Sequence, residues 1–407
     1  MNQSRSAPVG PVDRLAACAL VAMLGCAALI LPTPQARADA NPLSPQARVG
    51  REIFFDARLS NPQGTSCASC HDPLQGWGGN NASRSGVSAG NSPGTPVGRN
   101  PPTIGYVAFV PRFHLKKEDG KNKAVGGLFW DGRVNTLEEQ ARGPLFSKIE
   151  MNLANEAELA DRLRGAPYEA ELRAAFDLGA SPSDAQWTQV ALAAVAAFQR
   201  SPELAPFSSK YDAVLRGELK FSESEARGLR LFADPKKGNC NACHVFERDS
   251  KNPGDHLFTD FTYDNVGLPR NAAIPDNADA NHFDLGLCGP TRQRPRGLTT
   301  GVCGAFKVPT LRNAALRPFY FHNGSFTDLA EVVRFYVERD TNPEKWYPKD
   351  AKGKILVFND LPRQYTGNVN REEVPYDRKR GQKPRLNEAE IADVVAFIKT
   401  LDDGFKR

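Results

Sequence analysis

Two short motifs place a pair of thiols beside an imidazole at a fixed spacing. Both read Cys-x-x-Cys-His, one at residues 67–71 and the other at residues 240–244. Thiols at this spacing reach the two vinyl groups of one porphyrin, and the adjacent imidazole reaches its iron. A zinc knuckle or a redox dithiol is the alternative, which the histidine in both copies disfavours. The sequence therefore predicts two covalently attached c-type haems, bound through Cys67, Cys70, Cys240 and Cys243, with His71 and His244 as iron ligands.

The residue opposite each proximal histidine decides what its haem can do. Iron with a strong sixth ligand mainly transfers electrons, whereas an open sixth position binds peroxide or oxygen. Met151 is the one methionine outside the leader described below, so a His/Met haem depends on it. An isolated histidine is more often structural than a ligand. The remaining candidates are His114, His256, His282 and His322.

The composition is that of a globular protein with more than one core. The chain has 407 residues, of which 40% are hydrophobic and 24% charged, which excludes disordered, collagen-like and coiled-coil proteins. This length predicts two domains, each large enough to bury its own core. The formal net charge of +5 is scattered along the chain, so a DNA or RNA partner is disfavoured.

The first 38 residues are typical of an export signal. A short polar segment with basic residues precedes an apolar run over residues 15–31. The small residues Ala36 and Ala38 provide a cleavage site. We expect residues 1–38 to be removed and the mature protein to be periplasmic. The apolar run is short and ends at prolines, which disfavours a membrane span, and a lipid anchor is a minor alternative.

Helix-start signals and a weak repeat predict a mainly α protein. A Gly-x-x-x-Phe pattern precedes each haem motif, at residues 50–54 and 228–232. Capping residues predict helices beginning after Ser44, Ser183, Ser222 and Asn387. We expect two cytochrome-c-like haem domains with long connecting loops. They would span residues 39–203, with the peroxide site, and residues 204–407; the last helix can pack on either domain.

Two segments outside these helices carry further expectations. Cys288 and Cys303 are an even pair in one loop of an exported protein, which predicts a disulfide. Residues 341–385 are polar and rich in Pro and Gly, so we expect a long surface excursion there without assigned structure. No strand pattern is sustained enough to predict a sheet.

Several longer motifs, in this order with two haem sites, resemble the bacterial dihaem cytochrome c peroxidase and MauG family. The resemblance extends from about Ser44 to the C-terminus. The segments that carry it are Gly-Leu-Phe-Trp-Asp-Gly-Arg at 127–133, Leu-Glu-Glu-Gln-Ala-Arg-Gly-Pro at 137–144, Ile-Glu-Met at 149–151, Lys-Val-Pro-Thr-Leu-Arg-Asn at 307–313 and Tyr-Phe-His-Asn-Gly at 320–324.

The resemblance implies catalytic roles for four residues. Trp130 is similar to the tryptophan that lies between the two haems, where it can relay electrons or holes. Gln140, Pro144 and Glu150 match residues on the peroxide side of the first haem. A carboxylate there can take a proton from one peroxide oxygen and deliver it to the other, while the amide hydrogen-bonds the oxygen species. The proline shapes the cavity without offering a ligand.

The sequence departs from the peroxidase pattern at both haems. Peroxidases of the family carry a histidine that covers the first haem until reduction removes it, but no histidine lies between His71 and Asn100. The first haem should therefore be open from the start. At the second haem, Tyr336 replaces the usual methionine, as in MauG-like members. Ser325 and Asp328 form a capping pattern for a helix that turns Tyr336 inward.

The resemblance also implies a calcium ion between the domains, held by an asparagine side chain and backbone carbonyls. Asn100 matches the asparagine, and Arg317 and Phe319 stand where threonine and proline are usual. Carbonyl ligands survive a change of side chain, so one calcium ion is expected.

These expectations favour a periplasmic dihaem peroxidase that reduces hydrogen peroxide at the His71 haem, with the second haem relaying or sharing oxidising equivalents. Its electrons would come from a small redox protein such as a cytochrome c or cupredoxin. One alternative is a MauG-like oxidase that modifies a partner protein, although residues 228–240 lack the surface tryptophan which that route uses. Another is a non-enzymatic electron carrier, which would need two six-coordinate irons.

Overall fold

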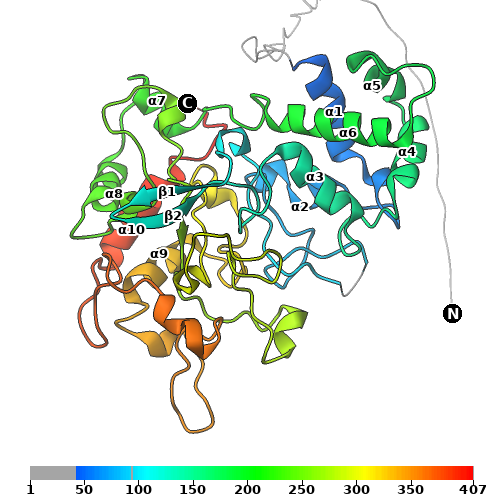
Figure 1. Ribbon diagram of the computed structural model, residues 1–407. Coiled ribbons are helices and arrows are strands. Elements are labelled where there is room, and N and C mark those ends of the chain that lie inside the picture. Colours follow the sequence, from blue (N-terminus) through cyan, green and yellow to red (C-terminus); the bar gives the residue numbers. More distant parts are fainter. Residues whose placement is uncertain (1–42, 93–94, 407) are drawn as a thin grey trace, which may run out of the picture. The chain divides into compact units, whose positions relative to one another are not determined.

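The computed structural model describes residues 43–92 and 95–406, so the predicted signal peptide lies outside the described residues. Helices carry most of the regular structure, as expected for a mainly α protein (Figure 1). The α-helices are α1 (Pro45–Phe55), α2 (Cys67–Cys70), α3 (Leu137–Phe146), α4 (Glu156–Arg164), α5 (Glu169–Ala175), α6 (Asp184–Gln199), α7 (Lys210–Leu215), α8 (Glu223–Ala233), α9 (Leu329–Glu338) and α10 (Glu388–Lys399). None of the described helices has both the length and the apolar character needed to cross a membrane.

A first hydrophobic core lies where α1 crosses α6, with α3, α4 and α5 packed around them. The start signals are confirmed: the Ser44 hydroxyl accepts a hydrogen bond from the Ala47 amide, and Ser183 forms a capping box with Gln186. These caps satisfy amide groups that the first helical turn leaves without a partner. Trp187 is fully buried at the centre of this core.

A second core forms between α8, α9 and α10. Ser222 and Asn387 make the expected capping boxes at the starts of α8 and α10. Helix α10 packs on α8 and α9, so the last helix belongs with the second core. The start of α9 differs from expectation, because the Asp328 carboxylate caps the Glu331 amide while the Ser325 hydroxyl bonds Asn323. Both cores lie in one compact unit, Pro42–Arg407.

The Gly-x-x-x-Phe repeat marks the same close contact in both cores. A β-carbon added to Gly50 would lie 1.9 Å from the Ala194 carbonyl oxygen on α6, and one added to Gly228 would lie 2.0 Å from the Asp393 carbonyl oxygen on α10. Only glycine lets these helix pairs approach so closely. The repeat therefore specifies the same type of helix–helix crossing in both cores.

The expectation of no sheet was wrong. Strand β1 (His114–Glu118) pairs antiparallel with β2 (Lys121–Val125), and β3 (Tyr263–Asp264) pairs with β4 (Phe306–Lys307). Asp119 and Gly120, both with positive φ, form the tight turn between β1 and β2. Asp-Gly is a strong hairpin signal, but the mostly polar, exposed flanking strands show no hydrophobic alternation.

The two remaining expectations had opposite outcomes. The disulfide between Cys288 and Cys303 is confirmed. Residues 341–385 were expected to lack assigned structure, yet they contain short 3-10 helices and supply a hydrophobic cluster. Tyr347, Phe358 and Val369 pack there against Phe335 of α9. Widely spaced apolar residues in a polar segment thus form a core that periodicity does not reveal.

We expect Gly228→Ala to destabilise the folded protein, because the new methyl group collides with the backbone of α10. Overpacking of this kind costs about 1–3 kcal/mol of unfolding free energy. Denaturant unfolding of the haem-loaded protein, followed by circular dichroism, measures the change. Gly165→Ala is the matched control, since a β-carbon there meets no atom within 4 Å. Equal stability of the two variants would contradict the close crossing.

Candidate haem sites and the wall between them

A cavity of about 480 Å³ lies beside the first Cys-x-x-Cys-His motif. Its lining includes Cys70 and His71 from the motif and the expected residues Trp130, Gln140, Pro144 and Glu150. Gln140 and Pro144 belong to α3, which a capping box at Thr136 and Glu139 starts, and Glu150 lies in the turn that follows. The structure thus brings the proximal histidine and the four residues singled out for catalysis into one cavity.

A second cavity, of about 190 Å³, lies beside the other motif. Cys240, Cys243 and His244 line it, and Tyr336 reaches it from α9. Burial raises the pKa of the Tyr336 phenol, so the free side chain is neutral. Coordination to ferric iron would require that proton to leave.

Both motif histidines are oriented for iron binding. The Nδ1–H of His71 donates to the Trp77 carbonyl oxygen at 3.2 Å, and that of His244 donates to the Phe258 carbonyl oxygen at 3.0 Å. These bonds leave each Nε2 free as a ligand atom. Burial lowers the pKa of His71 to about 4 and also lowers that of His244, so both rings stay neutral. Two donor sets of this kind fit two c-type haems.

The carboxyl group of Glu150 is suited to holding a proton. Burial raises its pKa, and the Ser147 hydroxyl and the Arg133 charge offset only part of that effect. Arg133 is itself bound to the Asp131 carboxylate at 2.9 Å, which limits how much positive charge it presents to Glu150. A carboxyl with a raised pKa can accept and return a proton near neutral pH.

The two cavities share a wall. Trp130 lines both of them, and its indole N–H donates to the Asn100 carbonyl oxygen at 2.7 Å. Lys307 also lines both, and its ammonium group donates to the Gly127 carbonyl oxygen. Burial lowers the pKa of Lys307 to about 7. Sequence reasoning gave Lys307 no role, although it begins one of the motifs that carry the resemblance.

Charged groups beside the wall form a network that sequence reasoning missed. The Arg99 guanidinium contacts the Asp131 carboxylate at 2.8 Å and the Asp284 carboxylate at 2.6 Å. Asp131 is fully buried. Burial raises its pKa, but Arg99 and Arg133 outweigh this effect and hold the pKa below its usual range. Sequence spacing could not find the network, because its members are 32 and 185 residues apart.

The other candidate ligands have varied surroundings. Met151 is buried in the first core, and the described linings of the two cavities do not include it. His256 donates from Nε2 to the Ser250 carbonyl oxygen and accepts from the Tyr211 hydroxyl at Nδ1, so both ring nitrogens are engaged. His114 is exposed at the start of β1. His282 lines the first cavity, and His322 lines both.

Two of the oxygen atoms expected to hold calcium, on Asn100 and Phe319, contact protein donors. The Asn100 amide nitrogen donates to the carbonyl oxygens of Phe319 and Phe321, at 3.1 and 2.9 Å. The Arg317 guanidinium lies 3.4 Å from the Asn100 amide oxygen and donates to the Pro101 carbonyl oxygen at 2.7 Å. A calcium ion does not fit beside a guanidinium on these oxygens, because like charges repel.

Comparisons with known proteins find dihaem enzymes. The sequence profile of the di-haem cytochrome c peroxidase family matches residues 44–220. Methylamine utilization protein MauG of Paracoccus denitrificans is 37% identical over 94% of this chain and 95% of its own length. Cytochrome c551 peroxidase of Pseudomonas aeruginosa is 29% identical over 75% of this chain and 76% of its own. The solved structure of the diheme peroxidase BthA from Burkholderia thailandensis E264 matches with a TM-score of 0.80 and 40% identity, over 88% of this chain and 86% of that one.

Proposed function

Because the chain belongs to the bacterial dihaem cytochrome c peroxidase and MauG family, we propose that it reduces hydrogen peroxide in the first cavity and relays oxidising equivalents to the second. The observation that carries this proposal is the placement of His71, Gln140 and Glu150 around one cavity, with Trp130 in the wall shared with the other. Each core would enclose one haem, with residues 39–203 and 204–407 as the two haem domains. The predicted signal peptide supports a periplasmic location.

In this proposal, residues of the chain transfer a proton between the two oxygen atoms of peroxide. The bound haem supplies the redox chemistry and takes up the oxidising equivalents of peroxide. Glu150 accepts a proton from one peroxide oxygen and returns it to the oxygen that leaves as water. Gln140 donates a hydrogen bond to the oxygen species. Pro144 has neither an N–H nor a side-chain ligand, so it would offer no ligand to a haem iron held in this cavity.

At the second cavity, His244 and Tyr336 would both bind the haem iron. A phenolate favours ferric and higher oxidation states over the ferrous state, in contrast to a thioether. The second haem would therefore share oxidising equivalents instead of being held in the ferrous state as a store of one electron. Trp130 would carry charge between the two sites, since it lines both cavities.

A second candidate function is the oxidation of residues on a partner protein, as in a MauG-like oxidase. Residues 228–240 lack a tryptophan, but Trp346 lies in the hydrophobic cluster that also contains Tyr336. Its ring centroid is 5.5 Å from that of Phe335, which neighbours Tyr336 on α9. Trp346 is half-buried, so this cluster offers another path from the second cavity towards the surface.

We expect Glu150→Gln to slow peroxide consumption by about 10²- to 10⁴-fold, because the amide cannot carry the proton. The wild-type rate should also fall as the pH drops through the raised pKa of Glu150, since protonation removes the base, and this acid limb should vanish in the variant. Stopped-flow rates across pH, at equal haem content, measure both effects. Glu52→Gln, at an exposed carboxyl on α1, should behave as wild type. An unchanged rate in Glu150→Gln would remove Glu150 from the mechanism.

Replacing Tyr336 with Phe should alter the ferric electron paramagnetic resonance and absorption spectra of the second haem and raise its reduction potential. Removal of the phenolate takes away the ligand that favours the ferric state. Tyr320→Phe is the matched control, because Tyr320 also lines the second cavity. If the Tyr336→Phe spectra matched those of the wild type, Tyr336 would not be a ligand.

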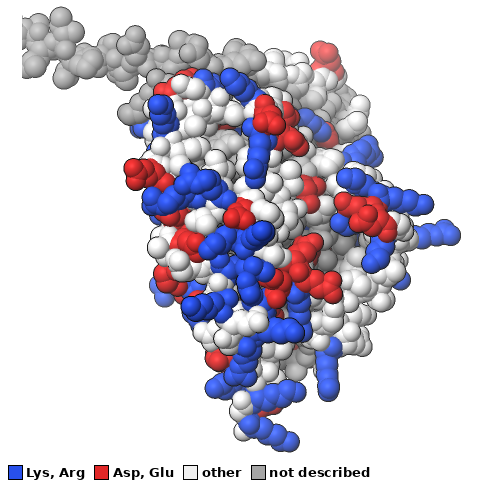
Figure 2. Space-filling model, turned by 90° about the vertical axis from the view of Figure 1, so that its left-hand side faces the viewer, with Lys and Arg blue, Asp and Glu red and all other residues white. Residues whose placement is uncertain are grey.

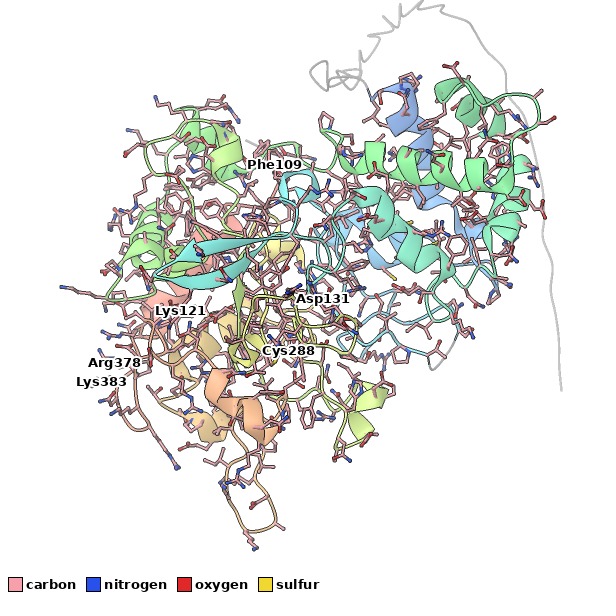
Figure 3. All side chains as sticks on the ribbon, viewed as in Figure 1. Phe109, Lys121, Asp131, Cys288, Arg378 and Lys383 are labelled. Carbon is pink, nitrogen blue, oxygen red and sulfur yellow. A yellow bond between two sulfur atoms is a disulfide. The ribbon has the colours of Figure 1, made fainter. Side chains whose placement is uncertain are left out.

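A basic surface lies over the second cavity and favours an acidic electron donor. Residues 373–376 and Leu386 line that cavity, and the loop between them carries Arg378, Lys379 and Lys383. Lys121, at the start of β2, lies on the same side of the molecule as Arg378 and Lys383 (Figure 3). Figure 2 shows lysine and arginine side chains gathered on this face. Complementary charge speeds the encounter of such partners.

Charge reversal at Lys379 and Lys383 should lower the rate at which the protein oxidises an acidic cytochrome c or cupredoxin by about tenfold at low ionic strength. The difference should shrink as salt screens the charges. Arg48→Glu combined with Arg84→Glu, at two exposed positions, changes the net charge by the same amount and is the control. Turnover with hydroquinone, a neutral donor, should be unaffected. An equal loss with hydroquinone would mean that the variant damages the haem site instead of docking.

A further inference from the structure

The polar contacts of the Arg317 guanidinium are with two neutral oxygen atoms. It donates to the Pro101 carbonyl oxygen at 2.7 Å and lies 3.4 Å from the Asn100 amide oxygen. Among the described residues, no carboxylate contributes appreciably to the pKa of Arg317. Burial lowers its pKa to about 10. The Arg317 charge is therefore stabilised by dipoles, as a bound metal cation would be by carbonyl ligands.

The backbone is shaped to admit this side chain. A β-carbon added to Gly78 would lie 2.2 Å from one terminal nitrogen of Arg317. Glycine thus leaves room for the guanidinium between the segment after the first haem motif and the Asn100–Pro101 segment. The contacts join parts of the chain more than 200 residues apart, since Arg317 follows Asn100 by 217 residues.

Asn100 connects this cation to the wall between the cavities. Its backbone N–H donates to the His322 carbonyl oxygen at 2.7 Å, and its side-chain amide nitrogen bonds Phe319 and Phe321. Its own carbonyl oxygen accepts the indole N–H of Trp130. Any group that fixes Asn100 therefore also fixes Trp130 between the two cavities.

We propose that the guanidinium of Arg317 replaces the interdomain calcium that the family resemblance implies, and that it holds the Asn100–Trp130 wall in place without a metal ion. Calcium needs about six to eight oxygen ligands at 2.3–2.6 Å. The Arg317 guanidinium lies beside one oxygen of the expected set, the Asn100 amide oxygen, and bonds the carbonyl oxygen of the next residue, Pro101. A calcium ion can leave its site, whereas the guanidinium is a covalent part of the chain. The replacement therefore makes the positive charge permanent. This role of Arg317 is the same whether the protein acts as a peroxidase or as a MauG-like oxidase.

Metal content and stability of the wild-type holoprotein test the first part of the proposal. After dialysis in calcium buffer and gel filtration, elemental analysis should find far less than one calcium per chain. The unfolding temperature should be the same in calcium and in the chelator EGTA. One tightly held calcium per chain, with an unfolding temperature that falls in EGTA, would overturn the proposal.

Arg317→Thr, which restores the residue usual at this position, tests the second part. The variant should bind one calcium per chain, and its unfolding temperature should rise with calcium and fall again in EGTA, because a ligand that binds only the folded state stabilises it. Magnesium at the same concentration should stabilise it less, since Mg²⁺ demands a tighter octahedral site. A variant with no calcium response would show that the guanidinium does not occupy a cation site.

Arg317→Lys is the matched control. It keeps a positive charge at the junction, so it should neither bind calcium nor respond to EGTA, and calcium binding by this variant would contradict the proposal. If Arg317→Thr does not fold in ordinary medium, expression with added calcium should recover haem-loaded protein, whereas equal failure with calcium and with EGTA would overturn it.

Discussion

The relation between the two haem cavities depends on one buried asparagine. Asn100 uses its amide N–H, its carbonyl oxygen and both ends of its side chain in hydrogen bonds or close polar contacts with distant segments. Leaving a buried polar group without a partner costs about 1–3 kcal/mol, so the loss of any one of these bonds is resisted. Trp130 cannot turn its indole away from Asn100 without such a loss. The wall between the cavities is therefore held by local polar bonds as well as by packing.

The charged groups next to this wall leave the pKa of the Glu150 carboxyl raised. A buried charge is costly unless an opposite charge or hydrogen bonds stabilise it. Asp131 meets this requirement by contacting both Arg99 and Arg133. Burial affects the pKa of Glu150 more than the charge of Arg133 does, and the same guanidinium is paired with Asp131. An unpaired Arg133 would hold Glu150 ionised more firmly and make it a weaker proton acceptor.

The sequence predicted the groups whose chemistry is local. A capping box specifies where a helix starts, so the starts of α6, α8 and α10 were predicted correctly. A Cys-x-x-Cys-His motif specifies its ligands by spacing alone, and His71 and His244 stay the predicted iron ligands. The network of Arg99 with Asp131 and Asp284, and the position of Arg317, come from contacts across long sequence separations that no local pattern encodes. The hydrophobic cluster within residues 341–385 was missed for the same reason, because its members have no regular period.

The two cavities show how one helix crossing can support two different sites. Gly50 on α1 and Gly228 on α8 allow the same close approach of helices, and in both halves the proximal histidine is oriented by a backbone carbonyl. The difference lies in what lines the rest of each cavity. In the first, α3 and its following turn contribute an amide, a proline and a carboxyl, none of which is a strong iron ligand. In the second, α9 contributes the phenol of Tyr336, which can bind iron once deprotonated. A small set of side chains therefore gives the two cavities different chemistry, and the repeated scaffold need not change.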